Sequence, residues 1–179
     1  MIYKYRIEKN SDNLNYLVKE VEINLNWKIE YNESKKIVSF MNENFHLDKM
    51  AEEYMYMIAL DSKCHVNGIF EISHGTVNAS LVGIREIFIR LLLSSATSFI
   101  LLHNHPSGSP NKSFEDIKVT KKIREASEIM GIKILDHIII GKDCFYSFCE
   151  DGCLWWIRES YFPLLKFIFC LLNKYRDMI

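Results

Sequence analysis

An α/β domain built on a mixed β-sheet, with helices flanking the sheet, is the fold class that this sequence predicts. Two continuous apolar runs, Tyr54 to Leu60 and Phe99 to Leu102, have the length and composition of buried strands. Residues 84–94 instead place their apolar side chains at the spacing of one buried helix face. Segments of these kinds follow one another as helix, strand, strand, helix, strand, helix, strand, strand, an order typical of α/β domains.

The first part of the chain is unevenly patterned. Residues 1–9 are a candidate edge strand, whereas residues 10–33 are rich in Asn, Asp and Glu and predict no element. Residues 34–49 carry a stripe of apolar side chains that is typical of a helix. After the first apolar run, Asp61-Ser62-Lys63 is expected to turn the chain into a second strand from Val66 to Ile72.

The second half predicts one more helix followed by two strands. Ser113, followed three residues later by Asp116, is a signal for a helix start, and Gly131 is a natural end. Residues 134–140 are predicted as a strand, and residues 144–148 as another after a short turn. The basic cluster on this helix is interpreted as its solvent-facing side; it comprises Lys118, Lys121, Lys122 and Arg124.

The composition bounds the function classes. With 179 residues, of which 49% are apolar, the chain can bury one core, and disorder is not expected. The net charge of −1 gives no electrostatic support to a partner such as a nucleic acid. The five cysteines are odd in number and form no repeated CxxC pattern, which indicates reduced thiols and a cytoplasmic location.

The aromatic and apolar stretch at residues 153–172 raises the question of a membrane span. Arg158, Glu159 and Lys166 interrupt this stretch, and Pro163 breaks it. The uninterrupted apolar segments are shorter than the roughly 20 residues that a bilayer requires. We therefore expect no membrane span, and a helix or loop that packs on the domain or on a second subunit in a homo-oligomer.

His103 and His105 are candidate metal ligands. Residues i and i+2 of a strand point to the same side, so both imidazoles could face one ion, while Asn104 would point away. Asp116 is the candidate third ligand, because side chains in the first turn of a helix lean back toward its N-terminus. Hydrolytic zinc sites have such ligand sets, with one position left open. The alternative is a polar strand end, with Ser113 serving only as a helix cap.

The spacing of these residues resembles a known motif. The string His103-x-His105-Pro106-x6-Ser113-x2-Asp116 looks like the JAMM (MPN+) metalloprotease motif, H-x-H-P-x6-S-x2-D. The segments GTVNASLVGIREIF, LLHNHPSGSPNKSFEDI and GIKILDHIIIGKDCFYSF are similar to the RadC family of bacterial JAB-domain proteins.

This resemblance defines three parts of the chain. It covers residues 34–150, leaving residues 1–33 as an N-terminal extension and residues 151–179 as an aromatic, apolar C-terminal tail. It implies a single JAB/MPN domain with the cytidine-deaminase-like fold.

The resemblance also implies a function. The resemblance implies a zinc-dependent hydrolase of peptide or isopeptide bonds, with the metal expected to be bound by His103, His105 and Asp116; iron and manganese remain alternatives. Glu53 would be the general base that activates the metal-bound water, with Glu52 as a one-residue alternative. The Ser113 hydroxyl would donate a hydrogen bond to the oxyanion of the tetrahedral intermediate. A peptide or protein is the substrate partner that this activity requires.

A DNA-associated accessory protein is the second interpretation, because RadC relatives carry a proposed role in DNA repair and occur on mobile elements. The balanced charge argues against it, as does the helix-hairpin-helix module that usually precedes the domain in RadC proteins and is not recognised in residues 1–33. A third interpretation, a non-catalytic interaction domain, is disfavoured by the intact motif.

Four further residues carry expectations. His74 is a candidate for lining a substrate groove. Asp136 and His137 are neighbours within a strand and should point to opposite faces, so a structural, hydrogen-bonded histidine is expected rather than a second metal site. Lys112 stands where RadC relatives often have a proline, which predicts a somewhat looser loop before Ser113.

Overall fold

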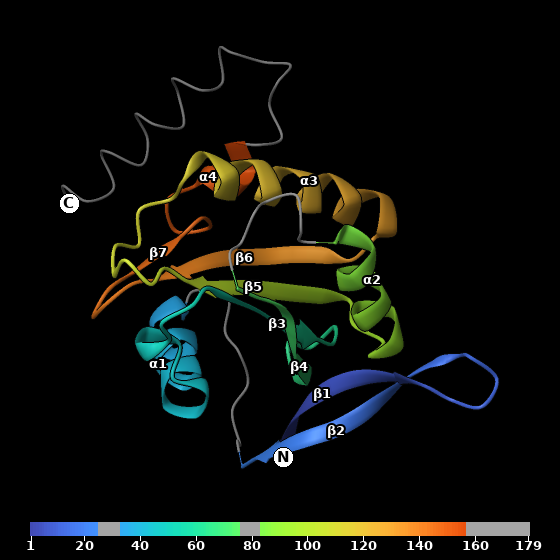
Figure 1. Cartoon of the computed structure of the whole chain (residues 1–179). Coiled ribbons are helices and arrows are strands. Elements are labelled where there is room, and N and C mark those ends of the chain that lie inside the picture. The colour runs from blue at the N-terminus through green and yellow to red at the C-terminus, as the bar shows by residue number, and fades with distance from the viewer. Residues whose placement is uncertain (25–32, 76–82, 157–179) are drawn as a thin grey trace.

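The computed structural model describes residues 1–24, 33–75 and 83–156, and within them a seven-stranded mixed sheet is flanked by helices (Figure 1). The strand order is β2-β1-β4-β3-β5-β6-β7. The pairs β1/β4 and β5/β6 are parallel and the other pairs are antiparallel. The predicted α/β fold with a mixed sheet is therefore confirmed.

The elements have the following bounds. The strands are β1 (Ile2–Lys9), β2 (Asn15–Ile23), β3 (Tyr54–Leu60), β4 (Val66–His74), β5 (Ser98–Asn104), β6 (Lys133–Ile140) and β7 (Phe145–Ser147). The helices are α1 (Ser34–Phe45), α2 (Ile84–Leu93), α3 (Phe114–Met130) and α4 (Cys153–Trp156), with a 3-10 turn at Leu47–Lys49.

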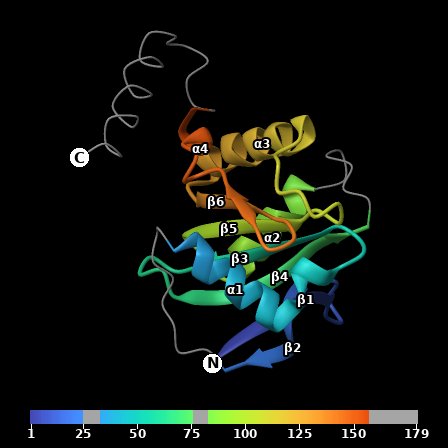
Figure 2. The same ribbon diagram turned by 90° about the vertical axis from the view of Figure 1, so that its left-hand side faces the viewer.

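Strand β3 is buried on both faces, which explains its continuous apolar sequence. Its odd-numbered residues, among them Met55 and Met57, pack with α2 and α3. Its even-numbered residues, among them Ile58 and Leu60, pack with α1. Figure 2 shows the same arrangement, with α1 on one side of the sheet and α3 on the other.

The N-terminal strand was expected at the sheet edge, and this expectation is wrong. Strand β1 lies between β2 and β4, and β2 forms the edge instead. Strand β2 was not predicted because most of its residues are exposed, so no alternating apolar pattern marks it. The turn before it is closed by Asn10, whose Oδ1 atom accepts hydrogen bonds from the N–H groups of Asp12 and Leu14.

The C-terminal region is described only as far as residue 156, so most of the predicted tail lies outside the described residues. Arg124 was assigned to the solvent-facing side of its helix, but its side chain is buried, and that assignment is wrong. Its guanidinium donates a 2.6 Å hydrogen bond to the carbonyl of Leu154 and pairs with Glu128 at 2.9 Å. Arg124 thereby ties α3 to the start of α4.

Among the described helices, none combines the length and the apolar character that crossing a membrane would demand.

Candidate metal centre

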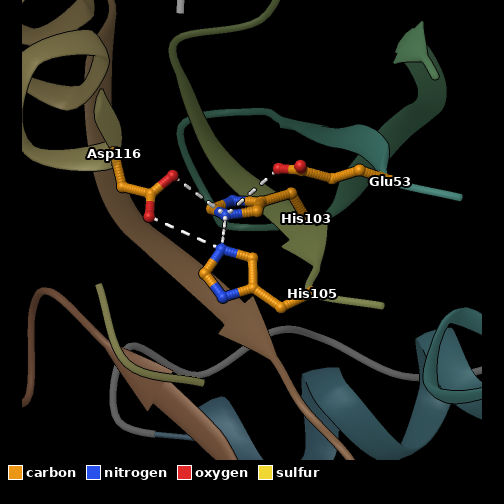
Figure 3. Close-up of side chains that lie close together, drawn as sticks. All are labelled: Glu53, His103, His105 and Asp116. Atoms are coloured by element: carbon orange, nitrogen blue, oxygen red, sulfur yellow. Dashed lines mark hydrogen bonds and ion pairs between the residues drawn. The ribbon is translucent and has the colours of Figure 1, made fainter. Parts of the chain in front are cut away.

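Three segments meet at one end of the sheet, and one of them, the start of β3, is distant in sequence from the other two. Strands β3 and β5 are antiparallel with Met55 opposite His103, so the start of β3 lies beside the end of β5. This register brings Glu53, just before β3, next to the two histidines at the end of β5. The first turn of α3 adds Asp116, and Figure 3 shows the four side chains pointing toward one another.

The ligand atoms of Glu53, His103, His105 and Asp116 lie within 4.8 Å of one another. The Nε2 atoms of the two histidines are 3.1 Å apart. Asp116 approaches them with one oxygen each, Oδ1 at 3.2 Å from His103 and Oδ2 at 3.5 Å from His105. A Glu53 oxygen lies 3.8 Å from the Nε2 atom of His103, at the rim of the cluster.

Asp116 is held by the start of its own helix. The Ser113 hydroxyl accepts a hydrogen bond from the Asp116 N–H, and both the hydroxyl and the backbone N–H of Ser113 donate to Asp116 Oδ2 at 2.7 Å. Burial raises the pKa of Asp116, but the attraction of His103 and His105 in their protonated forms and the hydrogen bond from Ser113 outweigh it, so the pKa lies below its usual range. The carboxylate therefore keeps its charge at neutral pH.

The tautomer of His105 follows from its contact with the loop. Its Nδ1 atom lies 2.9 Å from the carbonyl oxygen of Ser109, which can only accept, so Nδ1 carries the proton. In neutral His105 the Nε2 lone pair consequently faces His103 and Asp116. The hydrogen bond with Asp116 raises the pKa of His105 against the opposing effect of burial.

The structure distinguishes between the two candidate glutamates. Glu53 joins the cluster and its side chain is 21% exposed, whereas that of Glu52 is 62% exposed and hydrogen-bonds His74.

The Asn104 side chain points away from the histidines, as expected, and holds the backbone on both sides of Glu53. It accepts from the N–H of Tyr54 at 2.8 Å and donates to the carbonyl of Glu52 at 3.0 Å.

The donor set fits a divalent metal ion. Two imidazole nitrogens and a carboxylate are a ligand set that zinc, iron and manganese accept. Zinc–nitrogen bonds of about 2.0–2.1 Å place ligands of a tetrahedral site about 3.4 Å apart. The distances of 3.1, 3.2 and 3.5 Å among His103, His105 and Asp116 lie close to that spacing. The chain thus contains a cluster that could bind a metal ion.

Beside the cluster, the sequence analysis missed the buried Thr120 and the partner of the buried His137. His137 is hydrogen-bonded, as expected, but its partner is His103, with 2.9 Å between Nε2 and the Nδ1 atom of His103. The Thr120 hydroxyl lies 2.6 Å from the Nδ1 atom of His137. The sequence offered one signal for this pair, the presence of His137 within the predicted strand 134–140. That signal did not show that this strand would pair with the strand of His103.

Lys112 attaches the loop before Ser113 to the segment that follows β7, and the expectation that this loop is looser than in RadC relatives stays a prediction. The Lys112 ammonium donates to Asp151 at 2.8 Å and to the Tyr146 hydroxyl at 2.5 Å.

His74, the candidate groove residue, stacks on the ring of Tyr54, with 4.1 Å between the ring centroids. Its role toward a substrate stays a prediction.

Comparison with known proteins places these residues in one family. Residues 31–153 match the model of the RadC-like JAB domain. The UPF0758 protein of Pelobacter propionicus is 43% identical over 111 residues, which are 62% of this chain and 48% of that protein. The UPF0758 protein of Clostridium acetobutylicum is 45% identical over 103 residues, 58% of this chain and 45% of its own length. The chain spans about half the length of the curated relatives it matches.

Proposed function

This chain belongs to the family of RadC-like JAB domains, and we propose that it is a zinc-dependent hydrolase that cleaves a peptide or isopeptide bond. The observation that carries the proposal is the convergence of Glu53, His103, His105 and Asp116 within 4.8 Å, because these are the residue types that metal-assisted hydrolysis needs. The JAMM-like spacing of the motif supports the same reaction class.

Three residues would hold the metal: the Nε2 atoms of His103 and His105 and the carboxylate of Asp116. When bound, zinc supplies Lewis acidity, which lowers the pKa of water and polarises a substrate carbonyl. The chain contributes a rigid arrangement, because the loop carbonyl of Ser109 orients His105 and the capping box at Ser113 orients Asp116.

Glu53 is the residue suited to moving the proton. Its carboxylate lies at the rim of the cluster, 3.8 Å from the Nε2 atom of His103, and is partly exposed. It would accept a proton from the attacking water and return it to the leaving amine. The Ser113 hydroxyl donates to Asp116 in this structure, so it would have to turn away to assist the substrate carbonyl.

Metal analysis of the purified chain tests the binding half of the proposal. We expect about one zinc per chain by mass spectrometry, lost in a His103→Ala/His105→Ala double variant. The matched control is His74→Ala, which removes an imidazole outside the cluster. Zinc content that is unchanged in the double variant would refute the metal site, and iron or manganese in its place would correct the metal.

The catalytic half is tested with fluorogenic peptides and with lysine-linked isopeptides. Glu53→Gln should keep the zinc, and its rate of hydrolysis should fall by several orders of magnitude. Glu52→Gln should hydrolyse the peptides at about the wild-type rate. Equal activity in wild type and Glu53→Gln would exclude Glu53 as the base. Salt-sensitive binding of DNA by the wild type, without hydrolysis of any peptide, would instead favour the DNA-associated function.

A further inference from the structure

We propose that His137 and Thr120 form a hydrogen-bond relay that fixes the tautomer of His103, so that the Nε2 lone pair of His103 faces the cluster. The relay runs from β5 through β6 to α3 and ends at the backbone of Asp116. The relay itself is a property of the chain and does not require a metal. Only its expected effect on zinc affinity rests on the proposed function.

The direction of the relay is set at its end. The Thr120 hydroxyl lies 2.5 Å from the carbonyl oxygen of Asp116 and 2.6 Å from the Nδ1 atom of His137. A carbonyl can only accept, and a hydroxyl has one proton, so Thr120 donates to Asp116. Both contacts are hydrogen bonds only if Thr120 also accepts, so the Nδ1 atom of His137 carries a proton.

The next link follows from the neutral form of His137. Its ring is completely buried, where an uncompensated charge is costly, so the ring carries one proton, and that proton is already on Nδ1. Its Nε2 atom must then accept, and its partner at 2.9 Å, the Nδ1 atom of His103, must donate. In its neutral form His103 then has no second proton, so its Nε2 atom presents a lone pair to His105 Nε2 at 3.1 Å and to Asp116 Oδ1 at 3.2 Å, an arrangement that a cation bound between them would complete.

The opposite tautomer has a specific structural cost. If His137 carried its proton on Nε2, it would donate to His103, and the Nε2 atom of His103 would be protonated and unable to bind a metal. Thr120 would then have to donate to His137 and would lose its bond to the Asp116 carbonyl. The Asp116 carbonyl would keep only its helical N–H partner, and because Thr120 is fully buried, solvent cannot replace the lost hydroxyl bond.

The geometry gives Asp116 two functions. Its carboxylate faces the cluster, and its carbonyl terminates the relay that orients His103. One turn of α3 therefore positions two of the proposed ligands, and the loop carbonyl of Ser109 positions the third. His137 and Thr120 are positioning residues in this arrangement, since neither belongs to the metal-ligand cluster.

The tautomer can be measured directly in the metal-free full chain. Nitrogen-15 NMR of histidine-labelled protein at about pH 8, where imidazoles are largely neutral, distinguishes protonated from bare ring nitrogens. We expect His103 and His137 both to carry the proton on Nδ1. A His103 ring protonated on Nε2 in the wild type overturns the relay, whether or not the chain binds zinc.

Four variants separate the relay from mere packing. His137→Leu removes the acceptor, while His137→Gln can place its amide oxygen near the Nε2 position and so restore it. Thr120→Val keeps the shape and removes the hydroxyl that fixes the His137 tautomer. Phe148→Leu is the matched control, because Phe148 stacks on His137 at 5.1 Å and makes none of the relay's hydrogen bonds.

The expected readouts are zinc affinity by calorimetry and the NMR tautomer. His137→Leu should weaken zinc binding by about 10–100-fold, the usual effect of losing a partner of a metal-binding histidine. His137→Gln should recover most of the lost zinc affinity, and Phe148→Leu should bind zinc as the wild type does. The zinc affinity of Thr120→Val should lie between those of the wild type and His137→Leu, and its NMR spectrum should show both tautomers. If His137→Leu and Phe148→Leu lost zinc affinity equally, and His137→Gln did not restore it, His137 would have a packing role only and the relay would be refuted. A wild type that binds no zinc would refute the proposed function while the tautomer still decides the relay.

Discussion

The side chain of Asn104 accepts a 2.8 Å hydrogen bond from the backbone N–H of Tyr54, the residue that follows Glu53. Its amide nitrogen donates to the carbonyl of Glu52 at 3.0 Å, so one side chain holds the backbone on both sides of Glu53. Asn104 lies between His103 and His105 in the sequence. The strand end that carries both histidines thus also positions the proposed base.

The first prediction concerns Asn104→Ala. Releasing the segment around Glu53 should displace its carboxylate and lower kcat/KM by about 10–100-fold, since small misplacements of a reacting group are costly. Zinc content should stay at the wild-type level because no ligand is lost. Peptide hydrolysis and metal analysis on the same preparation measure both quantities.

The control for this variant is Asn67→Ala, which removes a comparable bridge to the carbonyl of Ser94 at 2.9 Å. Asn67 lies beside the end of β3, at the opposite end from Glu53. If both variants reduced hydrolysis equally, the loss would reflect general destabilisation, and the positioning of Glu53 by Asn104 would be disproved.

The second prediction concerns Ser113, whose hydroxyl serves the helix start and Asp116 in this structure. Ser113→Ala should lower the free energy of unfolding by about 1 kcal/mol through the lost cap. It should also weaken zinc binding, since Asp116 loses a hydrogen bond. Urea denaturation and calorimetry measure the two effects, and Ser113→Thr, which keeps the hydroxyl, should show neither. Unchanged stability and affinity, with hydrolysis reduced by about 10²–10³-fold, would instead place the hydroxyl on the substrate.

The sequence predicted those parts of the site that depend on local geometry. His103, His105 and Asp116 are close along the chain, and a strand end followed by a helix start is sufficient to bring them together. Glu53 was predicted only through the family resemblance, because its position depends on the antiparallel register of β3 and β5.

The missed features depend on pairing that a single sequence does not reveal. His137 contacts His103 across the parallel β5/β6 ladder, over a separation of 34 residues. Arg124 was assigned to the solvent as part of the basic cluster with Lys121 and Lys122, yet its own position on the helix turns it toward Leu154. A polar edge strand such as β2 has no apolar face and therefore no periodic signal.

The third prediction concerns Lys112, whose ammonium pairs with Asp151 at 2.8 Å. Both side chains are partly exposed, so Lys112→Met should cost at most about 1 kcal/mol of stability, and less at high salt. Thermal denaturation of Lys112→Met, Asp151→Asn and the double variant measures the coupling. The double variant should be little worse than either single one. Strictly additive losses would show that the pair does not anchor the loop.

The fourth prediction concerns Asp136, a buried carboxyl that joins β6 to α1 and β7. Its Oδ2 atom accepts hydrogen bonds from the hydroxyls of Ser147 at 2.6 Å and Ser34 at 3.3 Å. Its Oδ1 atom accepts from the backbone N–H groups of His137 and Cys149. Burial nevertheless dominates and raises the pKa of Asp136 to about 6.

The raised pKa fixes the sign of a pH effect on stability. The folded chain holds the Asp136 proton more tightly than the unfolded chain, in which the pKa is about 3.9. The stabilising contribution is therefore complete below about pH 4 and is lost as the pH rises through about 6, a difference of about 3 kcal/mol. Asp136→Asn cannot titrate, and its amide can still accept from the two N–H groups while donating to the serine hydroxyls.

We therefore expect the wild type to lose about 3 kcal/mol relative to Asp136→Asn between about pH 4 and pH 7. Urea denaturation over this range gives the difference in the free energy of unfolding at each pH. The exposed Asp12 in the β1–β2 turn provides the control, because Asp12→Asn should follow the wild-type curve. A constant difference between wild type and Asp136→Asn at all pH values would mean that Asp136 titrates alike in the folded and unfolded chain, and that the buried hydrogen bonds fully offset its loss of hydration.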